Sequence, residues 1–160
     1  MTEINTEYIQ NITNQINGIN SFLDISTSGL ENSSQAVIDQ RIEKLEGFLS
    51  LELNKTRQSI IDFMRSQYAT ILIQIEVLRP LVEGINLTDL SSVIAWINNL
   101  ITFFTGGYQK LLALQLELLA AIIPLSNAII AASSHNFPNL PGQPSINVQI
   151  DPITTEDITG

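Results

Sequence analysis

The residue types that carry out chemistry in proteins are sparse in this sequence and poorly spaced for it. The single histidine, His135, follows Ser133 and Ser134, and the next carboxylate along the chain is Asp151. A Ser/His/Asp triad would use these residues, but neither a nucleophile elbow nor an oxyanion loop surrounds the serines. The chain has no cysteine, which excludes thiolate nucleophiles, thiolate metal ligands and disulfides. We therefore expect no catalytic residues, and we interpret His135 as a surface residue at a helix end.

The remaining candidates for chemistry have simpler explanations. Asp39 and Glu43 lie four residues apart, but Arg41 and Lys44 are interleaved with them, as on a solvated helix face rather than in a general acid/base pair. One histidine and scattered acids form no metal-ligand cluster. The glycine pair 106–107 follows a predicted helix and not a strand, so it is not a phosphate-binding loop. The sequence predicts a protein that is not an enzyme and that has no cofactor and no metal site.

The composition indicates an uncharged surface, a large interface, or both. Charged residues make up 14% of the chain, against about 25% in ordinary globular proteins. From residue 90 to residue 150 the formal charges are Lys110 and Glu117, with His135 counted as neutral. The net charge of -9 argues against binding to nucleic acid or to anionic lipid, both of which need Lys and Arg. The acidic N-terminal residues also do not resemble a secretion signal.

Segment 1–23 is predicted to be an N-terminal heptad helix. Isoleucine at both a and d positions favours parallel trimers or tetramers over dimers. The residues between the stripe positions are polar but mostly uncharged, so they carry no charge code for choosing a partner, which suits an identical chain. The alternative is that this stripe packs on the second helix of its own chain. The predicted interface residues of this helix are Ile9, Ile12, Ile16, Ile19 and Leu23.

A Ser/Thr/Gly-rich linker, 24–35, separates this helix from a helical bundle predicted over 36–134. Ser28 with Glu31, or Asn32 with Gln35, could form the capping box that opens the next helix. That helix runs to about residue 79 and would be about 70 Å long at 1.5 Å per residue. A compact globule of this chain length is only ~30 Å across. We therefore expect an elongated molecule.

Segment 89–134 is predicted to be an apolar helical hairpin. Thr88 or Asp89 would cap its first helix, the glycines of 105–107 would form its tip, and Pro124 would bend its second helix. The second helix has apolar seams on two sides, which indicates neighbours on two sides. Burial between copies of the chain explains these seams best, and the predicted interface residues are Leu111, Leu114, Leu118, Leu125 and Ile130.

Insertion of segment 90–132 into a membrane is the alternative explanation for the low charge. A spanning helix needs about 20 predominantly apolar residues. Asn98 and Asn99 interrupt the first helix, and Lys110, Glu117 and Pro124 interrupt the second. A membrane partner is therefore the less favoured prediction.

Segment 135–160 is predicted to be an extended C-terminal arm. Ile146, Val148 and Ile150 alternate with polar residues between Pro144 and Pro152, as in one short β-strand. A lone strand is not stable in water. Because no second strand is evident, we expect these three residues to dock on a neighbouring chain.

These features together predict an all-α, elongated helical bundle or coiled coil with long heptad helices and an extended arm. The uncharged, Asn/Ile-rich composition and this architecture resemble a bacteriophage virion structural protein of the tail, baseplate or fibre-attachment type. The resemblance implies a non-enzymatic structural and assembly subunit located in the virion, and in the host cytoplasm during assembly. Its partners would be itself, as a homo-oligomer with a trimer preferred, and neighbouring structural proteins.

Overall fold

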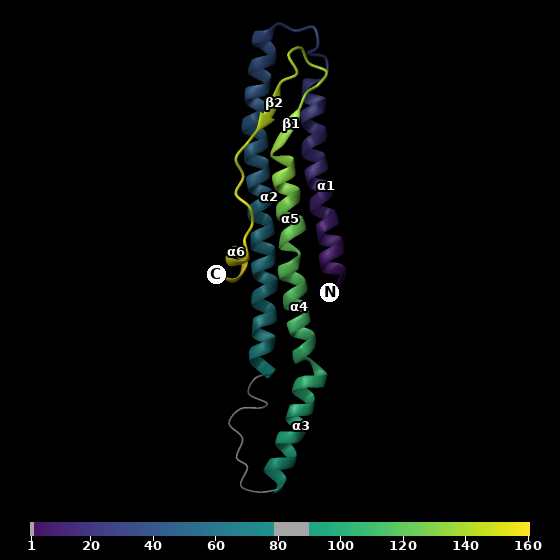
Figure 1. Ribbon diagram of the computed structural model, residues 1–160, viewed down its shortest axis with the longest axis vertical. Helices are drawn as coiled ribbons and strands as arrows, with labels where there is room; N and C mark the ends of the chain where they lie inside the picture. The colour runs from purple at the N-terminus through teal and green to yellow at the C-terminus, as the bar shows by residue number, and fades with distance from the viewer. Residues whose placement is uncertain (1, 79–89) are drawn as a thin grey trace.

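One long helix, α2 (Gln35–Leu78), is the axis of the molecule. The computed structural model describes residues 2–78 and 90–160, and Figure 1 shows α2 extending along most of its length. At 1.5 Å per residue the 44 residues of α2 span about 66 Å. Apolar side chains recur every three or four residues from Ile38 to Ile75 and face the core, and the fully buried ones are Ile38, Leu49, Leu53, Ile60 and Met64. The elongated all-α fold predicted from the sequence is confirmed.

The first helix is longer, and the linker shorter, than the sequence predicted. Helix α1 spans Thr2–Thr27, and Thr27 is buried with its hydroxyl donating to the Leu23 carbonyl at 3.2 Å. Gly29, with φ of +86°, supplies the left-handed residue that ends the helix. The linker is therefore 28–34 rather than 24–35. Neither predicted capping box opens α2, because Ser34 does so, with its hydroxyl accepting from the Val37 amide at 3.4 Å.

Helix α1 packs antiparallel to α2 and also contacts the later helix α5 (Ile122–Ala132). Tyr8 stacks on Phe63 with ring centroids 4.1 Å apart, and Phe22 lies 4.6 Å from Phe48. The isoleucine stripe is consequently used inside one chain. Ile9 is partly buried, and the other predicted seam residues are buried: Ile12, Ile16, Ile19 and Leu23. The prediction of a trimer seam is wrong for these residues, and the alternative partner, the chain's own second helix, is correct.

The segment predicted as a helical hairpin is instead a column of three helices set end to end. Helices α3 (Leu90–Gly106), α4 (Tyr108–Ala120) and α5 run in the same general direction, antiparallel to α2 (Figure 1). Gly107 separates α3 from α4 without reversing the chain. The column breaks again at Ala121, three residues before Pro124. Because proline lacks an N–H and crowds the preceding turn, the predicted bend at Pro124 appears as this break. The predicted Thr88 or Asp89 cap lies outside the described residues.

The C-terminal segment folds back on its own chain. Strands β1 (Ser134–Asn136) and β2 (Ser145–Asn147) pair antiparallel, with His135 opposite Ile146. Gly142, with φ of +77°, allows the turn that joins them. The prediction that the strand pairs with a neighbouring chain is therefore wrong. The side chains predicted to dock on a neighbour are buried within this chain: Ile146, Val148 and Ile150.

The arm then descends along α2 and ends in a short helix, α6 (Thr155–Thr159), which lies against α2 (Figure 1). Thr154 and Asp157 form a capping box at its start. The Arg57 guanidinium donates to the Asp151 carbonyl at 2.8 Å and lies 3.3 Å from the Asp157 carboxylate. The buried Ser126 hydroxyl accepts the Ile153 amide at 2.9 Å. These contacts hold the arm against α2 and α5.

Candidate functional site

His135 lies in β1 with its side chain 15% exposed, so it is more covered than the sequence predicted. Its Nε2 lies 2.8 Å from Oδ1 of Asp24, and its ring meets Phe137 edge-on at 4.9 Å. Ser133 donates its hydroxyl to the Ile130 carbonyl at 2.6 Å. Ser134 is the next residue before His135 on a strand, so their side chains point to opposite faces. The imidazole is thus paired with a carboxylate, but neither serine is aimed at it.

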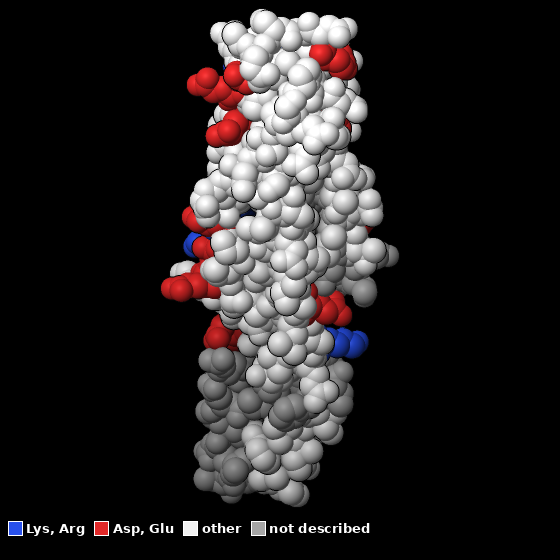
Figure 2. Space-filling view, turned by 45° about the horizontal axis from the view of Figure 1, so that its top comes forward, with Lys and Arg blue, Asp and Glu red and all other residues white. Residues whose placement is uncertain are grey.

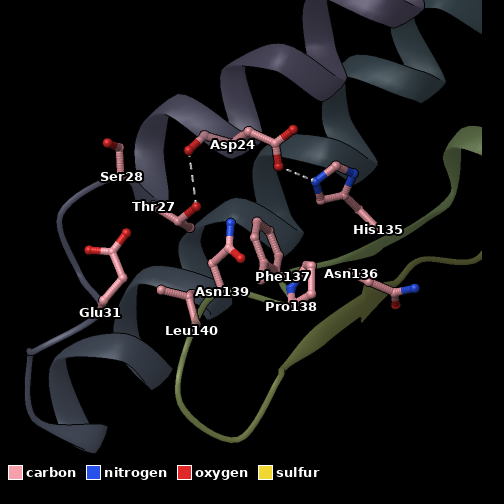
Figure 3. Close-up of a pocket in the computed structure, with 10 residues that line it drawn as sticks. All are labelled: Asp24, Thr27, Ser28, Glu31, His135, Asn136, Phe137, Pro138, Asn139 and Leu140. Atoms are coloured by element: carbon pink, nitrogen blue, oxygen red, sulfur yellow. Dashed lines mark hydrogen bonds and ion pairs between the residues drawn. The ribbon is translucent and has the colours of Figure 1, made fainter.

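The contact between His135 and Asp24 borders an open hollow of about 530 Å³ at one end of the bundle. The hollow lies between the end of α1, the turn that follows it and the loop after β1. Figure 3 shows the Asp24 carboxylate pointing at the imidazole, with Ser28 and Glu31 on the opposite side of the hollow. A nucleophile and a general base are therefore not brought together here. The pair ties β1 to the end of α1 and has a structural role in this geometry.

The described residues hold no cluster of metal-ligating side chains. Within 2–78 and 90–160, no group of three or more His, Cys, Asp or Glu residues is placed to hold a metal ion. Asp39 is exposed and accepts a hydrogen bond from the Gln35 amide at 2.8 Å, and Glu43 is exposed as well. These two acids belong to a solvated helix face, which agrees with the interpretation from the sequence.

The predicted interface residues of α4 and α5 differ in how far they are buried. Leu118 and Leu125 are buried against the chain's own helices, and Leu111 and Leu114 are partly buried against the same core. Ile130 remains 38% exposed. The inner seam of α4 and α5 is therefore used for intrachain packing, and only its outer side is free for a partner.

The unusual surface of this protein lies at the α3 end. Helix α3 contacts α4, but over 90–101, where its side chains are described, it contributes no residue to the buried core. Its exposed apolar side chains recur at spacings of four, three and four residues, which is a heptad stripe. The neighbouring end of α2 exposes further apolar side chains. We call this surface the apolar pole, and it comprises Leu72, Ile73 and Val77 of α2 with Leu90, Ile94, Ile97 and Ile101 of α3.

Charge is sparse at this end, where the exposed Glu76 lies between Ile73 and Val77 on α2. Helix α3 has no charged residue. On the face shown in Figure 2, acidic and basic side chains border the upper and middle parts, and the described residues at the lower end are neutral. Monomeric soluble proteins rarely expose large contiguous apolar patches, so the exposed stripe of α3 makes the apolar pole a candidate binding surface.

The stretch Tyr108–Ala132 is long and apolar enough to cross a membrane, by length and composition alone. A third of its most apolar window is buried inside the bundle. The shorter stretch Leu90–Ile101 is also apolar. The inner side chains of α4 and α5 are therefore already engaged with protein.

The contacts of Arg57 with Asp151 and Asp157 were not predicted from the sequence, because these partners lie 94 and 100 residues further along the chain. The pKa of Asp157 is lowered, first by the hydrogen bond from the Thr154 backbone and then by the Thr154 hydroxyl and the Arg57 and Arg65 charges. The Thr-x-x-Asp pattern of residues 154–157 is the local signal that could have revealed the capping box.

We expect acid to loosen the arm. Because the folded pKa of Asp157 is below that of an unfolded aspartate, its stabilisation is complete above roughly pH 4 and is lost as the pH falls through the folded pKa. Amide hydrogen exchange around α6, compared on the two sides of this pH, checks the expectation. Asp157→Asn should remove most of the response, and Asp151→Asn is the matched control because only the backbone of Asp151 contacts Arg57. An unchanged response in Asp157→Asn would contradict this assignment.

Comparisons of the chain with protein-family models, with curated proteins and with solved structures find no match.

Proposed function

We propose that this protein is a non-enzymatic structural subunit that assembles with copies of itself. The apolar pole supports the proposal most directly, since Leu90, Ile94 and Ile101 are between 51 and 74% exposed on one helix stripe. A partner that covers exposed apolar surface contributes about 25 cal/mol of favourable free energy for each Å² removed from water. An elongated molecule whose described residues bring no nucleophile and base together suits a mechanical role.

A virion component, such as a phage tail, baseplate or fibre subunit, is the context that we propose for this assembly. The support is the low charge, the long heptad helices and the elongated all-α fold. Neighbouring structural proteins would be further partners, and the protein would act in the virion after assembly in the host cytoplasm. The net charge of -9 disfavours a nucleic-acid partner. The sequence argument for a trimer no longer applies, because the isoleucine stripe of α1 on which it rested is buried within the chain.

Sedimentation velocity over a range of micromolar concentrations tests the proposal. The expected result is a concentration-dependent shift from monomer to oligomer that persists at high salt, because apolar contacts are not screened. A single monomeric species at every concentration would contradict self-assembly.

A membrane-active protein is the second candidate, and the length of the apolar stretch Tyr108–Ala132 favours it. Inserting this stretch would require α4 and α5 to leave the core, where Leu118, Leu125 and Ile129 are buried. Glu117, the tenth residue of this stretch, would also enter the bilayer, where an acidic side chain is costly. Flotation with liposomes separates the two functions: the structural subunit stays in the dense fraction, and a membrane-active protein floats.

A further inference from the structure

A second stripe of exposed side chains runs along the outer side of α4 and α5, away from the core. Its positions recur at alternating spacings of three and four residues, as in the seam of a coiled coil. We call it the outer seam, and its six exposed members are Ala113, Leu116, Ala120, Ile123, Asn127 and Ile130. Side chains on the opposite side of the same helices are buried, among them Leu118, Leu125 and Ile129. The outer seam therefore keeps its direction across the break at Ala121.

Large and small side chains alternate along the outer seam. The large ones lie seven residues apart and are 68, 65 and 38% exposed: Leu116, Ile123 and Ile130. The small ones lie between them: Ala113, Ala120 and Asn127. When two such seams run antiparallel about a two-fold axis between residues 121 and 122, each large side chain meets a small one, as Ile123 meets Ala120. In a parallel pairing, large residues would meet large ones and alanine would meet alanine. The outer seam is thus complementary to a second copy of itself.

Helix α1 borders the outer seam with a neutral polar surface. Thr13, Asn17 and Asn20 of α1 line a shallow hollow of about 240 Å³ together with the alanines of α5, of which Ala131 is exposed. Over residues 8–23, α1 carries no charge at all, whereas the outward face of a surface helix usually carries charged residues. A two-fold axis across the outer seam brings the two α1 helices to the same side. Their lack of charge keeps like charges apart there, which matters for a chain of net charge -9.

We propose that two copies of the chain pair antiparallel through their outer seams, with the neutral surface of α1 at the rim of the contact. The inference rests on the proposed self-assembly and assigns to it a surface other than the apolar pole. A two-fold contact uses the same patch in both copies. The alternation of large and small side chains about one centre meets that requirement.

The charged residues beside the outer seam do not oppose this pairing. Helices α4 and α5 carry two, Lys110 and Glu117. In the two-fold register, Lys110 lies level with residue 133 of the second copy. Two residues further on is His135, which holds the 66% exposed side chain of Asp24, so charges of opposite sign lie at the same level. Glu117 lies level with residue 126, where α5 is neutral.

The size of the contact predicts a dimer of moderate affinity. Residues 113–130 span about 27 Å at 1.5 Å per residue, and a strip of one helix diameter, about 10 Å, then covers roughly 270 Å² in each copy. The adjoining surface of α1 adds a strip of similar size. The total of roughly 1,000 Å² is at the lower end for specific interfaces. We therefore expect association at micromolar concentrations.

Cysteine cross-linking tests the register, because the chain has no cysteine of its own. Leu116→Cys and Asn127→Cys are made as separate proteins, one of them with an affinity tag, and are then mixed and oxidised. The expected product is the mixed disulfide dimer, because position 116 of one copy would face position 127 of the other. Leu51→Cys mixed with Asn127→Cys is the matched control, since Leu51 is 56% exposed but lies on α2, outside the outer seam.

The outcomes of this experiment separate the inference from the proposed function. A yield of mixed disulfide no higher than with Leu51→Cys, in protein that sediments as an oligomer, would overturn the inference and leave the proposed function intact. Disulfides that join Leu116→Cys only to itself would indicate a parallel pairing and would overturn it too. A single monomeric species at every concentration would overturn both.

A double variant gives an equilibrium measurement. Leu116→Gln with Ile123→Gln should weaken dimerisation at least tenfold by sedimentation, with unchanged helix content by circular dichroism, because both side chains are about two-thirds exposed. Val37→Gln with Leu51→Gln, at two exposed positions of α2, is the control and should sediment as the wild type does. Equal dimerisation of the outer-seam variant and the wild type would overturn the inference. Co-flotation of the wild type with phosphatidylcholine vesicles, lost in the outer-seam variant, would identify the outer seam as a lipid surface and overturn it as well.

Discussion

Replacing Leu49 by alanine is expected to lower the free energy of unfolding by about 2–5 kcal/mol. Leu49 is fully buried on the stripe that α2 turns toward the core, next to the contact between Phe22 and Phe48. The substitution removes buried methyl groups and leaves a cavity that long, rigid helices cannot close. Since small domains are stable by only about 5–15 kcal/mol, this is a large share of the total. Urea unfolding followed by circular dichroism measures it.

Leu51→Ala is the matched control for this measurement. Leu51 has the same residue type and lies on the same helix two positions later, but it is 56% exposed. Its truncation should change the free energy of unfolding by less than about 0.5 kcal/mol, as surface substitutions usually do. Similar effects of the two substitutions would mean that α2 does not face the core as described.

The second large effect is expected in the arm. Ile146→Ala should destabilise the arm by about 2–5 kcal/mol, because Ile146 is 1% exposed and pairs with His135 across the two strands. A loss of 2 kcal/mol corresponds to a roughly 30-fold increase in exchange from locally open states. Two amides report on it. Val148 donates to the Ser133 carbonyl at 2.8 Å, and Ile153 donates to the Ser126 hydroxyl.

The pattern of exchange decides whether the arm opens by itself. We expect the amides of Val148 and Ile153 to exchange faster while those in the middle of α2 keep their protection. Asn147→Ala, at the exposed neighbouring position of β2, should leave both sets unchanged. Equal acceleration in α2 and in the arm would show that the arm and the bundle unfold as one unit.

The helices could be predicted from the sequence because their signal is local. The stripe of α2 repeats every three or four residues, and each of its described members from Ile38 to Ile75 is buried or partly buried. The stripe of α1 is equally regular. What the periodicity does not contain is the identity of the partner, because an apolar stripe packs as well on its own chain as on another copy. The prediction of a trimer seam failed for this reason.

The reversals of the chain were harder to predict. A glycine pair permits a sharp turn but does not require one, and Gly107 in fact separates two helices that run the same way. Strand β1 consists of Ser, His and Asn, without any apolar alternation, and it is defined only by its pairing with β2. We therefore expected Ile146 to pair with a strand of another chain, whereas its partner strand, β1, lies in the same chain.

The candidate site was only partly accessible from the sequence. The low charge of segment 90–132 was evident and led to the prediction of an interface there. Which side of the column is free depends on what covers it, and that is a property of the three-dimensional packing. Leu118 and Leu125 proved to be core residues. The exposed stripe lies on α3, where the spacing of Leu90, Ile94, Ile97 and Ile101 was the signal that could have indicated it.

The contact between Arg57 and the arm also sets an order of events during folding. Asp157 follows Arg57 by 100 residues, whereas the Arg41 side chain reaches Ser26 across only 15. Closing the longer loop from an open chain costs about 1.7 kcal/mol more in entropy. If the bundle forms first, Arg57 and Asp157 are already close, and this entropy cost is reduced. On the ribosome, α6 cannot dock on α2 until residue 157 has emerged, so the arm is the last of these segments to join the fold.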